Sequence, residues 1–160
     1  MYSTARLTCV LALGAIALAA QVVPADTVQT TAMVGLATGQ TARINLLNPG
    51  VLPPAVGVVC NAEVTYLDGA GTVRKTASVS VNPGTSQHVD LHSDTDLSLA
   101  PATRLEIRAT IAIPNILPPT TASSTTTTPT PACKLISTLE IFDSITGRTE
   151  AVVGKVETID

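Results

Sequence analysis

The sequence predicts an all-β protein, an antiparallel β-sandwich of about seven strands. Apolar and polar residues alternate with period two in many short segments, and turn residues separate these segments. Val, Thr, Ile, Ala and Leu dominate the composition, which favours strands over helices. Alternation of this kind is typical of antiparallel sheets that pack one face on a core and expose the other to water.

Residues 1–25 are expected to be a secretory signal peptide that precedes the sandwich. Arg6 is the lone charge before an unbroken apolar run, residues 7–20, and small residues follow it. This run is too short to span a bilayer of roughly 30 Å. Cleavage after Ala19 or Ala25 would suit the small-residue rule. We therefore expect residues 26–160 to form one secreted domain, extracellular or periplasmic, without a membrane span.

The first expected strand covers residues 28–36, and its alternation places one set of side chains on a common face: Val28, Thr30, Ala32, Val34 and Leu36. The strands expected after it are residues 41–47, 58–67, 72–81 and 85–91. Turns at Asn48-Pro49-Gly50, Asp68-Gly69-Ala70-Gly71 and Asn82-Pro83-Gly84 separate them.

Residues 104–113 have the most regular alternation, and two more strands follow, residues 135–142 and a last one that ends at Val153. The inward side chains expected from parity are Ala42, Ile44, Leu46, Val58, Cys60, Ala62, Val64, Tyr66, Leu105, Ile107, Ala109, Ile111 and Ile113.

The placement of turns resembles that of bacterial immunoglobulin-like modules of the cell-adhesion-related (CARDB-like) type. The resemblance covers most of residues 28–113. It rests on Gly39-Gln40 before a strand, on Asn48-Pro49-Gly50 after it, on the segment 64–69 and on Asn82-Pro83-Gly84-Thr85. It implies a seven-strand immunoglobulin-like sandwich with extracellular binding or spacer duties. Since the core Trp and the cysteine placement of antibody domains are absent, it implies no particular site.

Two cysteines remain after signal cleavage, because Cys9 lies in the apolar run of the signal. Cys60 shares its parity with Val64, and Cys133 shares its parity with Leu135, so both sulfurs are expected to face inward. In an oxidising compartment an even pair predicts a Cys60–Cys133 disulfide. Two free buried thiols are the alternative.

A candidate interaction rim comes from two Leu-Pro-Pro sequences. One belongs to the loop between the second and third expected strands, and the other leads into a Thr/Pro-rich loop at residues 114–132. In an immunoglobulin-like strand order these loops share one end of the sandwich, where they would form an apolar, polyproline-like surface. The rim residues are Leu52, Pro53, Pro54, Leu117, Pro118 and Pro119. Two stiff loops without a ligand are the alternative, and residues 120–131 are expected to be either a disordered loop or a glycosylated spacer.

A candidate metal site comes from His88, Asp90 and His92, which fall on one face of an extended strand. Imidazole and carboxylate ligands suit zinc or a similar divalent ion. The alternative is an ordinary solvated strand end, because the same residue types are common on outward faces.

Composition excludes several classes of function. The net charge of −3 at pH 7 gives no electrostatic footprint for nucleic acid. Tyr66 and Phe142 are the only aromatic residues after the signal, too few for a base-stacking platform. No nucleophile elbow, zinc-protease motif or phosphate loop occurs, so no enzyme and no cofactor is expected.

We therefore expect a non-catalytic structural or adhesive module with protein partners or self-association, such as a subunit of an extracellular filament. The first expected strand could pair with the sheet edge of a neighbouring subunit. A soluble binding module that uses the rim is the alternative, and a metal-dependent enzyme is a third.

Overall fold

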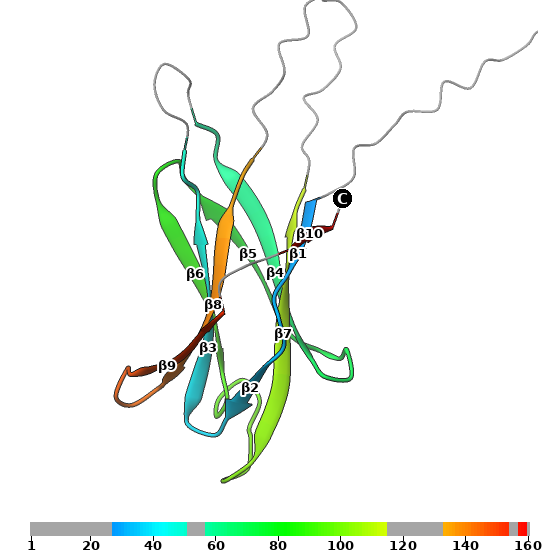
Figure 1. Cartoon of the computed structure of the whole chain (residues 1–160), viewed down its shortest axis with the longest axis vertical. Coiled ribbons are helices and arrows are strands. Elements are labelled where there is room, and N and C mark those ends of the chain that lie inside the picture. Colours follow the sequence, from blue (N-terminus) through cyan, green and yellow to red (C-terminus); the bar gives the residue numbers. More distant parts are fainter. Residues whose placement is uncertain (1–26, 51–56, 115–132, 154–156, 160) are drawn as a thin grey trace, which may run out of the picture.

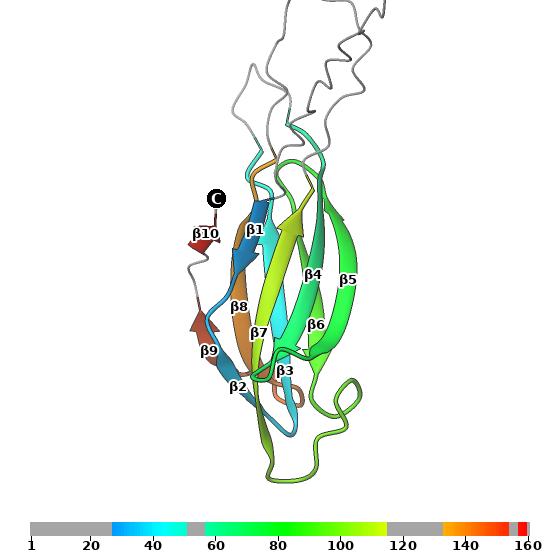
Figure 2. The same ribbon diagram turned by 90° about the vertical axis from the view of Figure 1, so that its right-hand side faces the viewer.

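The computed structural model describes residues 27–50, 57–114, 133–153 and 157–159. Over these residues the chain forms ten strands in two antiparallel sheets, which pack face to face as a sandwich (Figures 1 and 2). The expected all-β sandwich is confirmed. Residues 1–26, which include the expected signal peptide, lie outside the described residues.

The larger sheet has the order β10-β1-β7-β4-β5, with β2 also paired to β7. Its strands are β1 (Thr27–Thr30), β2 (Val34–Ala37), β4 (Cys60–Asp68), β5 (Val73–Val81), β7 (Arg104–Ile113) and β10 (Glu157–Ile159). The smaller sheet has the order β6-β3-β8-β9. Its strands are β3 (Gln40–Leu47), β6 (Ser86–His92), β8 (Ile136–Asp143) and β9 (Thr149–Val153).

Sequence alternation predicted the strands from β3 to β9 to within a few residues at each end. Their inward residues are the expected ones except Val58, which precedes β4 and is not buried. The side chains of Ile44, Leu46, Val64, Ile107 and Ile111 are fully buried. The count of about seven strands was too low. Alternation marked eight segments, and the structure has two strands more than that, for two reasons. The first expected strand is divided into β1 and β2, and the short strand β10 has too few residues to give a periodic signal.

The common face predicted for the first strand is wrong. Thr30 pairs with Thr110 and Val34 pairs with Ile107. The chain therefore advances four residues from β1 to β2 while β7 advances only three between the same two pairs. The extra residue is a β-bulge, which shifts the side-chain parity. Before the bulge Gln29 faces the core, and after it Leu36 is buried and Val34 packs against the core as predicted; Val28, Thr30 and Ala32 are not buried.

The strand order differs from the immunoglobulin arrangement at the first and the last strands. The first immunoglobulin strand belongs to the same sheet as the second, whereas β1 and β2 pair with β7 in the larger sheet. Strand β4 lies between β5 and β7, and β3 pairs with β6, as the corresponding immunoglobulin strands do. The sixth and seventh immunoglobulin strands are neighbours in one sheet. Here β7 belongs to the larger sheet, and β8 pairs with β3 in the smaller one. The Thr/Pro-rich connection between β7 and β8 therefore links the two sheets.

Tyr66 joins the two sheets through the core. It projects from β4 and is completely buried. Its hydroxyl accepts a hydrogen bond from the backbone N–H of Ile44 in β3 at 3.0 Å, and it lies 2.8 Å from the carbonyl oxygen of Val89 in β6. Ile44 and Val89 are partners in the β3–β6 ladder, so the phenol bridges a pair of backbone groups in the opposite sheet.

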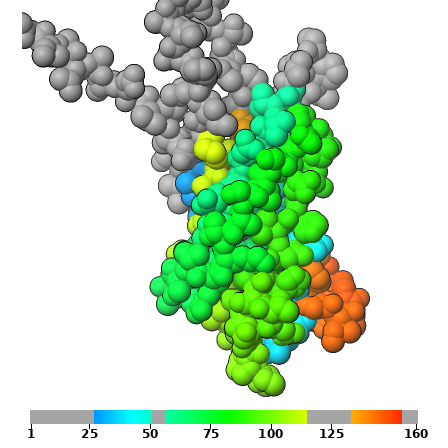
Figure 3. Space-filling model, turned by 180° about the vertical axis from the view of Figure 1, so that it is seen from behind, coloured from blue at the N-terminus to red at the C-terminus, as the bar shows by residue number. Residues whose placement is uncertain are grey.

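One side of the sandwich is closed by its two edge strands. Residues of β5 and β6 form a continuous surface in Figure 3. The Lys75 ammonium of β5 reaches the carboxylate of Asp96, just after β6, at 2.7 Å. A lysine at this position also protects an edge strand from pairing with other chains.

Candidate functional site

The two long connections that carry the Leu-Pro-Pro sequences start and finish at the same end of the sandwich. Leu47, the last residue of β3, is opposite Ile136, the first residue of β8. Strand β4 begins and β7 ends at this same end, as Figure 1 shows. We call this region, residues 48–50, 57–59, 82–85, 113–114 and 133–135, the loop end. The six rim residues themselves lie outside the described residues.

Asn48 organises the loop end. Its side chain is buried, and its Nδ2 donates to the carbonyl oxygens of Val58 at 2.8 Å and Val81 at 3.0 Å. Its Oδ1 accepts from the N–H of Gly50, and its own carbonyl oxygen accepts from the N–H of Gly84. One asparagine therefore ties together the end of β3, the approach to β4 and the turn between β5 and β6.

Gly50 and Gly57 lie against each other on either side of the connection between β3 and β4. A Cβ placed on Gly57 would lie 3.6 Å from the Cα of Gly50 and only 2.6 Å from the Cβ of Pro83. Gly50 also has a φ of +70°, a conformation that favours glycine. The connection thus begins and ends at one point, packed on the turn at Pro83.

A disulfide joins the two sheets at the loop end. Cys60 begins β4 in the larger sheet, and Cys133 precedes β8 in the smaller one; their Cα atoms are 5.4 Å apart. Cys60 is buried, and Leu135 and Leu139, which share the parity of Cys133, are buried too. The predicted Cys60–Cys133 pairing is confirmed. Structural disulfides are typical of oxidising, non-cytosolic compartments.

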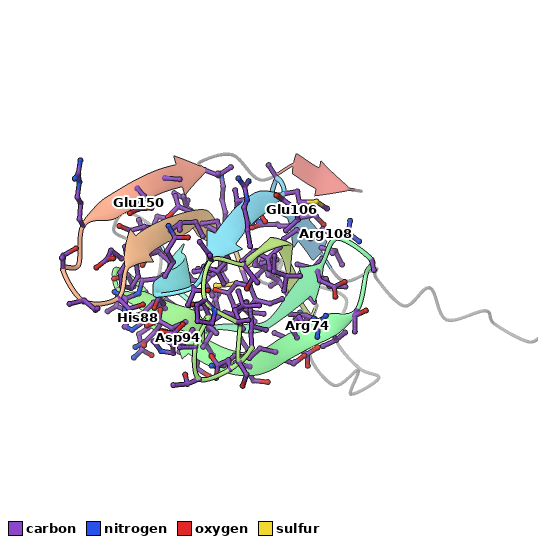
Figure 4. The ribbon with its side chains drawn as sticks, turned by 90° about the horizontal axis from the view of Figure 1, so that it is seen from below. Arg74, His88, Asp94, Glu106, Arg108 and Glu150 are labelled. Carbon is purple, nitrogen blue, oxygen red and sulfur yellow. A yellow bond between two sulfur atoms is a disulfide. The ribbon has the colours of Figure 1, made fainter. Side chains whose placement is uncertain are left out.

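The candidate metal residues occupy the outer face of the smaller sheet. His88, Asp90 and His92 project from β6, while Val89 and Leu91 between them face the core. Their partners in β3 are Asn45, Arg43 and Thr41. Figure 4 labels His88, together with Asp94 in the turn beyond β6. The shared face predicted for the three residues is therefore present.

Asp90 and His92 already have protein partners. The guanidinium of Arg43 holds the Asp90 carboxylate by two hydrogen bonds of 2.7 Å. Burial alone would raise the pKa of Asp90, but the hydrogen bonds and charge of Arg43 outweigh it, and the pKa is lowered. His92 Nδ1 lies 2.9 Å from the hydroxyl of Thr41. In the described part of the chain no three His, Cys, Asp or Glu side chains converge on a position for a metal ion.

Sequence reasoning missed the network that surrounds Arg43. Its guanidinium carbon stacks 4.9 Å above the ring of Phe142 in β8, a cation–π contact. Glu140, two residues earlier, accepts from Asn45 at 3.5 Å and from the hydroxyl of Thr149. Arg43 and Asn45 alternate with the predicted inward residues of the same strand, so their outward direction follows from the sequence. The pairing of β3 with β8, which brings these side chains together, has no signal in a single sequence.

The described residues contain no helix that is long and apolar enough to cross a membrane. Neither a protein-family model nor any curated protein matches the chain. Among solved structures, the chain is similar to the crystal structure of Thermotoga maritima 1070, with a TM-score of 0.46 and 14% sequence identity. The similarity covers 82% of this chain and 94% of that chain. At this identity it does not identify a family.

Proposed function

We propose that the chain is a secreted, non-catalytic structural or adhesive module that binds a protein partner through its loop end. The observation that carries the proposal is the fixed base of the two proline-containing connections. Gly50 and Gly57 meet on Pro83, Asn48 holds the turns together, and the disulfide joins the sheets beside Cys133. A fixed base lowers the entropy that a loop loses on binding, and so favours recognition by loops.

The chemistry of the rim supports a protein partner. Leu52 and Leu117 each precede two prolines, and such sequences present apolar side chains on an extended backbone that loses little freedom on binding. The outer face of the smaller sheet is assigned a structural role. There Arg43 pairs with Asp90 and stacks on Phe142, and these contacts within the sheet stabilise it.

Site-specific photo-crosslinking on the producing cells tests the proposal. A photoreactive residue at position 52 or at position 117 should give covalent adducts with a discrete partner protein. The matched control is position 145, since Ile145 is 91% exposed in the turn at the opposite end of β8. Absence of adducts at positions 52 and 117, or equal adducts at position 145, would contradict the loop-end proposal.

Secretion is tested separately. The intact mass of the secreted protein should correspond to cleavage near Ala25.

A subunit of an extracellular filament is the second candidate. Strand β1 and strand β2 attach to the domain through β7 and β10, and the described residues provide no partner strand for the outer edge of β2. A strand held in this way could pair with a neighbouring subunit instead. The truncation argued at the end of the Discussion separates the two candidates.

A further inference from the structure

The outer edge of the larger sheet is covered along only half of its length. Strand β10 pairs with Val28, Gln29 and Thr30 of β1. Strand β2 continues the same edge beyond the bulge, and none of the described strands pairs with its outer side. Across from this uncovered half lies β9 of the smaller sheet (Figure 2).

Backbone groups of Gly35 point out of this edge. In an antiparallel pair alternate residues direct their N–H and C=O groups at the partner strand. The backbone N–H of Thr38 donates to the carbonyl oxygen of Thr103 in the β2–β7 register. The backbone N–H and C=O groups of Val34 and Leu36 therefore also point at β7, and those of Gly35 and Ala37 point away from it. The N–H of Ala37 does so, since it donates to the side chain of Gln40 at 2.7 Å.

A pocket of about 400 Å³ lies between β2 and β9. Val34 and Gly35 of β2, Arg104 of β7, Ile141 of β8, and Glu150 and Ala151 of β9 contribute to its wall. We call it the β2 slot. Figure 4 labels Glu150 on β9 and Glu106 on β7, the residue that pairs with Gly35.

The side chain of Gln40 indicates what the β2 slot accepts. Its Oε1 accepts from the backbone N–H of Ala37 in β2, and its Nε2 donates to the carboxylate of Glu150 in β9. A carboxamide has the same donor and acceptor groups as a peptide unit. At one end of the slot, Gln40 thus occupies the place that a peptide group of an added strand would take.

Gly35 lets the side chain of Arg104 lie along the open edge of β2. A Cβ on Gly35 would lie 1.7 Å from Arg104 Nε, because the arginine side chain lies across the glycine. Arg104 pairs with Glu106 at 3.0 Å, but its side chain is 65% exposed and can receive a further carboxylate.

We propose that the β2 slot binds an extended peptide segment of a protein partner as an added strand on β2. The peptide places an acidic side chain beside Arg104 and small apolar side chains against Ile141 and Ala151. Backbone hydrogen bonds to Gly35 supply affinity, and the alternate side chains supply specificity. This site shares no residue with the loop end, so either site can fail its test without the other.

Three synthetic probes test the proposal on the purified full chain. The first is the capped pentapeptide Thr-Val-Asp-Val-Thr, the second has Lys in place of Asp, and the third has an N-methyl group on the Asp backbone nitrogen. NMR titration should shift the amide signals of Gly35 and Ala37 and the carboxamide signal of Gln40. The Asp peptide should bind up to about fivefold more tightly than the Lys peptide. N-methylation should weaken binding by about tenfold.

Two variants locate the effect. Arg104→Gln should abolish the preference for Asp over Lys, while the control Arg148→Gln, an exposed arginine in the β8–β9 turn, should retain it. Gln40→Ala should tighten binding, because the carboxamide no longer competes for Ala37. The proposal is overturned if millimolar Asp peptide leaves the Gly35 and Ala37 signals unchanged. It is also overturned if N-methylation has no effect, or if the shifts lie on β5 or at the loop end.

Discussion

At the residue scale, Tyr66 shows how one polar group can hold two sheets together. Its ring fills the core, and its hydroxyl lies between Ile44 N–H and Val89 C=O of the opposite sheet. Burial raises the pKa of this phenol, which keeps the hydroxyl protonated and able to donate. The alternation of residues 58–67 predicts an inward Tyr66, but it does not predict these partners, since they belong to strands of the other sheet.

Tyr66→Phe should lower the free energy of unfolding by about 1–3 kcal/mol, because Ile44 N–H and Val89 C=O then lose a buried partner. Urea unfolding followed by circular dichroism measures the change. Thr76→Ala, on the exposed face of β5, is the control and should stay within about 0.5 kcal/mol of the wild type. Equal stability of Tyr66→Phe and wild type would show that the phenol bridge contributes nothing.

Asp68, the last residue of β4, fixes the turn that follows it. Its Oδ1 accepts from the N–H groups of Thr72 at 2.8 Å and Ala70 at 2.9 Å, and its Oδ2 pairs with Arg74 at 2.6 Å. The backbone bond from Thr72 lowers the pKa of Asp68 most, Arg74 and Ala70 add to this, and desolvation opposes it.

A carboxylate with a lowered folded-state pKa contributes stability above its unfolded pKa, and this contribution is lost as the pH falls through the folded value. Wild-type stability should therefore decrease below about pH 4. Asp68→Asn should be less stable at pH 7 and should show a shallower decrease in acid. Melting temperatures between pH 7 and pH 2 measure both effects. If the melting temperature of Asp68→Asn falls with pH in parallel with that of the control Glu63→Gln, Asp68 does not contribute to the acid-dependent loss of stability.

At the scale of elements, the sequence predicted what alternation can express and missed what depends on pairing. Residues 104–113 repeat with period two, so their inward side chains were correct. The bulge after Thr30 has no periodic signal, because one inserted residue changes the parity without changing the composition. The β2 slot was missed for a related reason. It depends on Gly35 and Glu150, which are far apart in sequence and meet only through strand pairing.

The disulfide is an element-scale constraint with a measurable effect. It closes a loop with a sequence separation of 73 residues, for which the chain-entropy model gives about 4 kcal/mol. The double variant Cys60→Ala/Cys133→Ala should lose about this amount, and wild type under reducing conditions should behave like the variant. In the unreduced wild type neither thiol should be alkylated, as intact mass will measure. Alkylation of both cysteines without reduction would contradict the bond in solution.

At the scale of the whole molecule, the two sides of the sandwich differ. The β5–β6 side is closed and carries the Lys75–Asp96 ion pair. The opposite side contains the divided strand β1–β2, the partial cover by β10 and the β2 slot. Among the described strands, the outer side of β2 is therefore an edge without a partner strand. Prolines and cysteines mark the loop end in the sequence, whereas the open edge of β2 appears only when the registers are known.

The divided strand decides between a self-contained module and a strand-exchanged filament. Leu36 is fully buried, and the Gln29 carboxamide donates to the carbonyl oxygen of Leu135 and accepts from the hydroxyl of Ser137. The link to β3 is also fixed, since Gly39 N–H donates to Asp94 at 2.9 Å. These contacts within one chain favour self-completion.

A protein truncated before Gly39 should therefore be an unstable monomer, because it loses two paired strands and the core residue Leu36, whose removal alone costs about 2–5 kcal/mol. The full-length protein should stay monomeric at high concentration in light scattering, with the amides of residues 27–37 protected from hydrogen exchange. Strand exchange predicts a different pattern. The full-length protein would form oligomers, the truncated protein would be a stable monomer that cannot, and a peptide of residues 26–38 would restore assembly. That pattern would replace the self-contained module with a filament subunit, because the backbone bonds of β1 and β2 to β7 would then link neighbouring chains.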